Sequence, residues 1–263
     1  MISGIADAYD RTGAAWQAGP GLIYDRLADV ALDRCPIALA GALVLDVGAG
    51  TGAASRAASR RGASVVGVDA AFAMLAAGAA QRPPAAVADA LVLPFRSSAF
   101  DAAVAAFSLN HLEDPATALR ETARVVRTRG AIVATAYASD DTHPVKEAVD
   151  AAASARGWVQ EPWCSRLRTS ATPLLATVAR AAEAAADAGL DAARVDHVAV
   201  PFPDLGPQQL VAWRLGMAQM APFAATLTPA ERAGLVADAL ARLGDDFPML
   251  VRSFIVLTAV VGG

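Results

Sequence analysis

Lysine is almost absent from this chain of 263 residues: Lys146 is the only one, and arginine supplies nearly all of the 22 positive side chains. Aspartate and glutamate number 26, which gives a formal net charge of −4. A nucleic-acid groove needs clustered cations. The short runs "SRRGAS" and "RVVRTRG" instead end helix-like segments, where cations suit the helix dipole. We therefore expect no nucleic-acid partner.

Cysteine and histidine are also scarce, with two and three residues. Cys35 and Cys164 are far apart and lack metal-type partners nearby, which predicts reduced thiols in a cytoplasmic protein and no zinc site. The N-terminus has no basic segment followed by an apolar one, and the most apolar run, "FIVLTAVV", is too short to cross a bilayer. We expect a soluble protein with no bound metal and no membrane partner.

Apolar residues are abundant by contrast, at 55% of the chain. From residue 41 to residue 137, apolar runs alternate with helix-like segments, which is typical of a parallel sheet covered on both faces. Asp114 and Pro115 read as a helix start, and Thr228 with Glu231 as a capping box. Strands are expected at 42–47, 64–69, 85–90, 99–108, 131–137, 193–202 and 249–261. Helices are expected at 53–62, 70–80, 114–130, 144–157 and 172–189, with two more in 207–243.

The stretch "LVLDVGAGTGAAS" (43–55) predicts a strand, a tight glycine turn and a helix N-terminus, which together form a backbone socket for a ligand. Gly48, Gly50 and Ala53 also fit the spacing of dinucleotide sites. Asp46 argues against a dinucleotide, because its carboxylate would oppose a pyrophosphate by on the order of 4 kcal/mol at ~4 Å and an effective dielectric constant of ~20. A cationic amino-acid group, as in S-adenosylmethionine, would instead be attracted to the Asp46 carboxylate. The alternative interpretation is that Asp46 is only a polar residue at a strand end, whose carboxylate accepts hydrogen bonds from backbone amides.

Several motifs, in order, resemble class I S-adenosylmethionine-dependent methyltransferases of the small-molecule branch, with a type 11-like domain. "VLDVGAGTG" is similar to the first motif of that family, and "VVGVDAAFAML" to its second strand. Residues 87–135 resemble its block of "D-A…L-P-F…F-D…H…D…E…R-V-L-x-P-G-G". The chain has "TRGA" where many relatives have "KPGG", and we expect Gly130 to supply the left-handed turn there.

The resemblance implies S-adenosylmethionine as cofactor and S-adenosylhomocysteine as product. Asp69 would hold the ribose hydroxyls, Asp89 the adenine amine, and Met74 would pack on the adenosine. Phe107 would lie at the methionine end, and Tyr9 would fold over the cofactor. The full set expected to bind the cofactor is Tyr9, Asp46, Gly48, Ala49, Gly50, Asp69, Ala70, Met74, Asp89, Ala90, Leu91 and Phe107.

The resemblance also implies an α/β fold, a Rossmann-like doubly wound seven-stranded sheet with a helical cap made by insertions. We expect a helical lid in residues 1–40 and a cofactor-binding core in 41–137. A cap segment is expected in 138–171. The rest of the core would occupy 172–263, with a helical insertion at 205–245.

Methyl transfer requires alignment, desolvation and, for a weakly acidic acceptor, a base. His111, in "SLNHLED" after the fourth strand, is the candidate base; a structural or acceptor-shaping histidine is the alternative. His197 is expected on a solvated strand face. The residues expected to line the acceptor pocket are Trp16, His143, Trp213 and Met217, although helices packed on a sheet would carry the same residue types.

These observations together predict an S-adenosylmethionine-dependent methyltransferase that methylates oxygen or carbon of a small, apolar or aromatic metabolite, as in natural-product biosynthesis. A homodimer is compatible with this prediction. Two other functions stay open. One is a protein that keeps the cofactor but catalyses a non-methylating step such as cyclisation. The other is an NAD(P)-dependent oxidoreductase.

Overall fold

A single sheet of seven strands organises the computed structural model, which describes residues 4–262. The strands are β1 (Leu43–Val47), β2 (Ser64–Asp69), β3 (Ala85–Val87), β4 (Phe100–Ala106), β5 (Val126–Tyr137), β6 (Arg194–Phe202) and β7 (Leu250–Val260). Their order is β3-β2-β1-β4-β5-β7-β6. Strands β1 to β5 pair in parallel, and β7 runs antiparallel to both of its neighbours. A dinucleotide-binding sheet is mostly parallel in the order 3-2-1-4-5-6, so the antiparallel β7 argues against the oxidoreductase alternative.

Helices cover both faces of this sheet. The longer ones are α3 (Pro20–Leu32), α4 (Ala53–Arg60), α5 (Phe72–Gly78), α6 (Pro115–Val125), α7 (Pro144–Ser154), α9 (Val178–Asp187), α10 (Pro207–Leu215) and α12 (Pro229–Leu243). Successive strand residues point to opposite faces. In β4, Ala102 and Val104 pack in the core shared with α3 and α4, whereas Ala103 and Ala105 pack in the core shared with α6 and α9. The predicted doubly wound α/β fold is confirmed.

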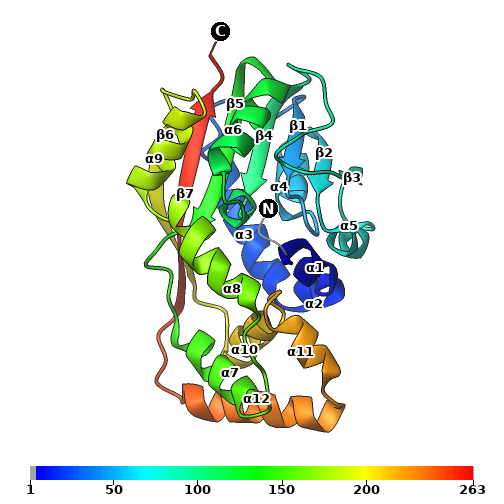
Figure 1. Cartoon of the computed structure of the whole chain (residues 1–263), viewed down its shortest axis with the longest axis vertical. Helices are drawn as coiled ribbons and strands as arrows, with labels where there is room; N and C mark the ends of the chain where they lie inside the picture. Colours follow the sequence, from blue (N-terminus) through cyan, green and yellow to red (C-terminus); the bar gives the residue numbers. More distant parts are fainter. Residues whose placement is uncertain (1–3, 263) are drawn as a thin grey trace.

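The shorter helical elements are α1 (Ile5–Asp10), α2 (Gly13–Ala18), α8 (Pro162–Arg166) and α11 (Ala221–Thr226), with 3₁₀ turns at Leu109–His111 and Thr172–Leu174 and a π-helical turn at Leu167–Ala171. In Figure 1 the sheet occupies the upper half, helices α7, α10, α11 and α12 the lower half, and α1 and α2 lie between them. Helix α7 contacts both α10 and α12. Helices α10, α11 and α12 lie between β6 and β7 in the chain.

The prediction of one helix over 114–130 was wrong at its C-terminal end. Helix α6 ends at Val125, and the next residue, Val126, already pairs with Phe100 in the sheet. The cations of "RVVRTRG" therefore lie mostly in a strand, where Arg127 Nε bonds Asp101 Oδ1 at 2.6 Å. Sheet pairing, a tertiary interaction, overrides the local helical pattern here.

Gly130 does not supply a left-handed turn either. Arg129 takes the positive φ, at 65°. Gly130 is instead required by close approach, because a Cβ there would lie 2.5 Å from the carbonyl oxygen of Asp101. The local change from the family pattern is thus an irregular stretch of β5 between Val126 and Ala131, in which Arg129 and not glycine takes the left-handed conformation.

Two other helix predictions also need correction. The helix expected over 172–189 begins only at Val178, because the side chain of Thr177 caps it by accepting from the backbone N–H of Arg180. Residues 207–243 hold three helices instead of two, since α10 ends at Leu215 and the short α11 precedes α12. The capping box of Thr228 and Glu231 at the start of α12 is confirmed.

Among residues 4–262, no helix combines the length and the apolar character needed to cross a bilayer. His197 is exposed on β6, and its Nε2 lies 3.2 Å from Asp140 Oδ1. This agrees with the solvated strand face expected for it.

Candidate functional site

A cavity of ≈ 1010 Å³, counted out to its open mouth, lies where β1, β2 and β4 end. Carboxyl ends of parallel strands in an open α/β sheet are the usual place for a ligand. Ten of the twelve residues expected to bind the cofactor line this cavity: Tyr9, Asp46, Gly48, Ala49, Gly50, Asp69, Ala70, Met74, Ala90 and Phe107. The structure thus brings together residues that span about a hundred positions of sequence, from 9 to 107.

The other two, Asp89 and Leu91, do not belong to this lining. Asp89 is exposed, and its Oδ1 accepts from the backbone N–H of Leu91 at 2.9 Å, which fixes the loop after β3. Ala88 and Ala90 face the cavity in their place. The carboxylate of Asp89 therefore lies at the rim, engaged with its own loop.

Asp46 is the most unusual group of the site. It is 1% exposed at the end of β1, and its Oδ2 accepts from the Ser55 hydroxyl at 2.6 Å. Its Oδ1 is buried and has no hydrogen-bond partner in the part of the chain that the structure describes. Burial raises the pKa of the Asp46 carboxyl to about 6. A buried carboxylate oxygen without a donor is costly, so this atom calls for a donor from outside the chain.

Asp69, at the end of β2, is held by backbone amides. Its Oδ2 accepts from Gly50 N–H and its Oδ1 from Ala71 N–H, both at 2.8 Å. Burial raises the pKa of its carboxyl, and these two amides partly offset that effect. Each oxygen keeps a free lone-pair direction, because a carboxylate oxygen can accept more than one hydrogen bond. The side chain is therefore fixed in place while it can still accept from a ligand.

Two glycines of the turn are needed for different reasons. Gly48 has φ 74°, and a Cβ there would lie 2.2 Å from the Cβ of Ser108, so the chain itself requires glycine. Gly50 has φ 52°, and its Cβ would meet only Met74 Cε at 3.5 Å and Asp69 Oδ2 at 4.0 Å. Both of these neighbours line the cavity, so a side chain at Gly50 would occupy ligand space.

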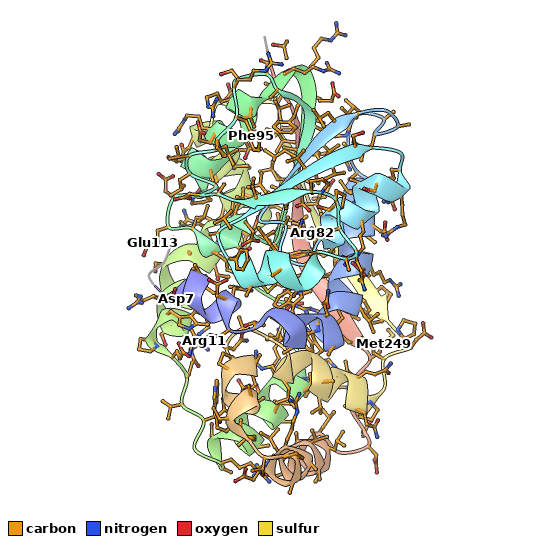
Figure 2. The ribbon with its side chains drawn as sticks, turned by 90° about the vertical axis from the view of Figure 1, so that its right-hand side faces the viewer. Asp7, Arg11, Arg82, Phe95, Glu113 and Met249 are labelled. Atoms are coloured by element: carbon orange, nitrogen blue, oxygen red, sulfur yellow. The ribbon has the colours of Figure 1, made fainter. Side chains whose placement is uncertain are left out.

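The first two helices, α1 and α2, contribute side chains to one wall of the cavity. The Tyr9 hydroxyl lies 3.2 Å from His111 Nε2, and the Tyr9 ring packs at 5.7 Å from that of Trp16. Arg11, just after α1, pairs with Glu161 at 3.0 Å, and Figure 2 shows it between the sheet-bearing half and the cap. Asp10 accepts from the first turn of α5 through Ala73 N–H at 2.8 Å. These contacts hold α1 over the cavity.

His111 is placed where the sequence suggested, at the cavity edge after β4. Burial lowers the pKa of its imidazole to about 4, so the ring is neutral at pH 7. Burial also raises the pKa of the Tyr9 phenol. The Tyr9–His111 pair is therefore an uncharged hydrogen bond, and the ring is a weak base in this state.

The residues expected to line the acceptor pocket separate into two groups. Trp16 lines the cavity, whereas His143, Trp213 and Met217 do not. His143 is the N-cap of α7: its Nδ1 accepts from Val145 N–H at 3.2 Å, and its Nε2 lies 2.8 Å from the carbonyl oxygen of Pro248. Trp213 is buried in the main core, and Met217 packs behind Trp16. Capping and core packing, the structural alternative, account for these three.

Sequence reasoning missed several residues of the site. Ser55 donates the hydrogen bond to Asp46 Oδ2. It lies in the first turn of α4, on the side that faces β1. Ser108 donates its hydroxyl to the Val47 carbonyl oxygen at 2.7 Å and thereby ties the β4 loop to the glycine turn. No sequence pattern pointed to Ser108, because the contact spans 61 positions. Other lining residues not foreseen are Ile5, Ala6, Thr51, Leu109 and Leu112.

Within residues 4–262, no group of three or more His, Cys, Asp and Glu side chains is arranged to hold a metal ion. The polar groups of the cavity are instead two carboxylates, one imidazole and a few hydroxyls. This set suits a ligand with N–H, O–H and cationic groups.

Comparison with known proteins agrees with this geometry. The family model described as "Methyltransferase domain" matches residues 45–134. Demethylmenaquinone methyltransferase of Mycolicibacterium paratuberculosis is 38% identical over 133 residues, 51% of this chain and 56% of that protein. The enzyme of the same name from Thermobifida fusca is 33% identical over 176 residues, 63% of this chain and 70% of that protein. The chain thus spans little more than half the length of the first of these relatives.

A solved structure shares the fold. The [4+2]-cyclase SpnF superposes with a TM-score of 0.54 at 22% identity, covering 91% of this chain and 82% of that one. The fold, the match to the methyltransferase domain and the coverage of the Thermobifida relative lead to one conclusion. The chain belongs to the class I S-adenosylmethionine-dependent methyltransferases.

Proposed function

We propose that this protein binds S-adenosylmethionine in the cavity at the ends of β1, β2 and β4 and transfers its methyl group to oxygen or carbon of a small, apolar or aromatic acceptor. The observation that carries the proposal is the unpartnered Oδ1 of Asp46. It is a buried acceptor, on a carboxylate, in the wall of the cavity. An ammonium group supplies both the missing hydrogen and the missing positive charge.

The remaining lining fits the other parts of the cofactor. Asp69 presents a fixed carboxylate suited to two vicinal hydroxyls, and Gly50 leaves the space beside it open. Met74 and the small residues Ala70 and Ala90 offer apolar surface for an adenine ring. A pyrophosphate would meet both carboxylates instead, and like charges at this distance repel.

When bound, S-adenosylmethionine supplies a methyl group on a positively charged sulfur. This chain's own residues align the two reactants and exclude water, which is the main source of acceleration in such a displacement. Tyr9, Trp16 and Tyr24 form an aromatic row over the cavity, with ring centroids 5.7 Å and 4.8 Å apart. These rings would close the site and favour a flat, apolar acceptor.

His111 is the proposed proton acceptor if the acceptor atom carries a weakly acidic proton. Its ring is neutral at pH 7 and faces the cavity, but a pKa of about 4 makes it a weak base. An acceptor that is already ionised needs no base. In that case His111 would shape the site together with Tyr9.

The names of the relatives support a small-molecule acceptor, since both are demethylmenaquinone methyltransferases. We accordingly extend the proposal to aromatic or quinone-like metabolites, with natural-product biosynthesis as the setting. The cytoplasmic location, the homodimer and the division of the chain into lid, core and cap remain predictions.

Binding of S-adenosylhomocysteine, measured by calorimetry, tests the cofactor. Asp69→Ala should weaken it by about 1–3 kcal/mol through lost hydrogen bonds. Asp114→Ala, which removes a helix cap outside the cavity, is the matched control and should leave the affinity unchanged. Equal affinities for the wild type and Asp69→Ala would contradict the proposed role.

A second candidate function is a non-methylating step such as cyclisation on the same fold. The weakness of His111 as a base is the observation that favours it. Methyl-labelled cofactor, offered with aromatic acceptors, separates the two candidates. Label transferred to product supports methyl transfer, whereas product formed with the cofactor intact supports the alternative.

A further inference from the structure

Three buried polar groups without partners meet at one place in this structure, away from the cofactor cavity's own lining. They are the Tyr137 hydroxyl, the Trp213 indole Nε1 and the Arg252 Nη1, three of the five such side-chain atoms in the described part of the chain. The Arg252 guanidinium carbon lies 4.0 Å from the centre of the Tyr137 ring and 4.7 Å from that of the Trp213 ring. One guanidinium therefore contacts both rings, and all three groups can donate a hydrogen bond.

The other side of Arg252 is fully used. Its Nε and Nη2 donate to the two oxygens of Asp141, both at 2.8 Å. Lys146 Nζ also pairs with Asp141, at 3.0 Å. This bidentate contact explains how the guanidinium is held in place, and it leaves Nη1 directed elsewhere.

The charges of the cluster do not balance. Arg252 and Lys146 carry two positive charges, and Asp141 carries one negative charge. The nearby Arg214 is already paired with Asp150 at 2.7 Å. The cluster thus has a surplus of one positive charge, which falls on Lys146, whose side chain is 29% exposed and lies beside the buried Arg252. This surplus favours an anion over a neutral partner at the site.

The cluster lies next to the proposed reaction site. Tyr137 ends β5, and Arg252 stands near the start of the antiparallel β7, so both are at the sheet edge where the cavity opens. Tyr24 and Phe107 line the cavity, and their ring centroids lie 6.1 Å and 4.5 Å from that of Tyr137. A single layer of aromatic rings therefore separates the cluster from the cavity.

We propose that Tyr137, Trp213 and Arg252 form a subsite for an ionised oxygen of the acceptor, a carboxylate, enolate or phenolate, which enters when the Tyr24 ring turns aside. This inference rests on the proposed function, because it assigns the acceptor's charge. A purely structural role, in which Arg252 pairs with Asp141, would account for the hydrogen bonds of its Nε and Nη2 but not for its unpartnered Nη1. Arg252 Nη1 and Trp213 Nε1 need an acceptor of their own, and the Tyr137 hydroxyl, which interacts with that of Tyr24, becomes free for the same acceptor when Tyr24 turns aside.

Two matched probes test the subsite by calorimetry, with and without saturating S-adenosylhomocysteine: 2-naphthoate, which is anionic, and 2-naphthamide, which has the same shape and no charge. The wild type should bind naphthoate at least about tenfold more tightly than the amide. Tyr137→Phe and Trp213→Phe each remove one donor and keep the ring, so each should reduce this preference by about threefold to tenfold. Arg252→Gln should abolish it.

Two control variants lie close by and lose groups that already have partners. Trp158→Phe removes an indole N–H that donates to the Gln219 carbonyl oxygen, and Arg214→Gln removes the guanidinium paired with Asp150. Both should keep the preference for naphthoate. If Arg252→Gln fails to fold, the two conservative variants decide the question.

The subsite is overturned if the wild type shows no preference for naphthoate, if naphthoate does not bind at millimolar concentration, or if the preference survives in both Tyr137→Phe and Trp213→Phe. A crystal structure with an ordered water only at Arg252 in the presence of naphthoate would also overturn it. These results are separable from failure of the proposed function. A chain that binds S-adenosylhomocysteine without a naphthoate preference loses only the subsite, and one that does not bind S-adenosylhomocysteine loses the proposed function.

Discussion

The Tyr9 hydroxyl of α1 forms a 3.2 Å hydrogen bond with His111 Nε2, across 102 positions of sequence. The two rings also pack at a centroid distance of 5.4 Å. Both residues line the cavity, so this contact fixes the orientation of the His111 ring there.

Tyr9→Phe should loosen the lid. The change removes one hydrogen bond and keeps the ring, so we expect S-adenosylhomocysteine to bind more weakly by about 1 kcal/mol, measured by calorimetry. Arg11→Gln is the companion variant. It breaks an exposed ion pair to Glu161, which should contribute between about 0 and 1 kcal/mol. A larger loss of affinity in Arg11→Gln than in Tyr9→Phe would show that the lid is held by charge and not by this hydrogen bond.

Cofactor affinity should depend on pH through Asp46. The pKa of its carboxyl is about 6 in the free protein, and an ammonium group binds the ionised form. Protonation therefore competes with binding as pH falls through 6. Between pH 7 and pH 5 the affinity for S-adenosylhomocysteine should drop about tenfold, which is the fall in the ionised fraction of Asp46. Titration calorimetry at several pH values measures this change.

Asp46→Asn provides the control for that pH dependence. The amide keeps the shape of the side chain and cannot ionise, so the variant should bind more weakly at pH 7 and show a flat profile between pH 5 and pH 7. A wild-type profile that is also flat would mean that Asp46 does not meet the ammonium group.

His111 should make the fold sensitive to acid. Its pKa is about 4 in the folded protein and near 6.5 in an unfolded chain, so the unfolded chain binds more protons between these values. The folded state is therefore destabilised as pH falls from about 6.5 to about 4, by about 3 kcal/mol in total. Asp46 acts in the opposite direction, because its pKa is raised on folding, so the two effects largely cancel in the wild type.

His111→Asn removes the acid destabilisation caused by the histidine and leaves the opposite effect of Asp46. Relative to wild type, its free energy of unfolding should rise by about 3 kcal/mol between pH 7 and pH 4, measured by urea denaturation. Equal pH dependence in the two proteins would show that the imidazole titrates normally and is hydrated in the cavity.

The two glycines of the turn should respond differently to alanine. Gly48→Ala forces a Cβ against Ser108 in a left-handed backbone conformation, so it should cost about 2–4 kcal/mol of folding stability. Gly50→Ala meets no atom closer than 3.5 Å, so it should cost about 1 kcal/mol of stability, from its φ. It should instead weaken S-adenosylhomocysteine binding by about 1–3 kcal/mol, because the methyl group enters ligand space. Thermal unfolding and calorimetry of both variants measure these effects, and an unchanged S-adenosylhomocysteine affinity in Gly50→Ala would contradict the proposal that the ligand occupies the space beside Gly50.

The sequence was most informative where the determinants are local. The strand before "GAGTG" and the glycine turn itself follow from an apolar run and from residues with freedom of φ. The caps of Asp114 and Thr228 were also predictable, because an N-cap acts on amides three residues away in the same chain. The glycine turn and the resemblance to methyltransferases together pointed to ten cofactor-binding candidates that line one cavity in the structure.

Prediction failed where a partner distant in sequence decides the outcome. "RVVRTRG" has a helical pattern, yet Val126 pairs with Phe100 of β4. His143 looked like a pocket residue, yet its ring nitrogens are occupied by Val145 and Pro248. Nothing in the local sequence of Ser108 or Trp213 indicates what each would touch.

Local residue patterns predict the seven strands in their chain order, the glycine turn and the acid at the end of β1, since these depend on backbone preferences and on hydrophobic patterning over a few residues. Contacts made by the folded chain leave Asp46 with one oxygen without a partner, bring Tyr9 to His111, and enclose Arg252 between Tyr137 and Trp213. Such contacts cannot be predicted locally, because burial and hydrogen bonding are set by every group around a side chain, and most of those groups come from other parts of the chain.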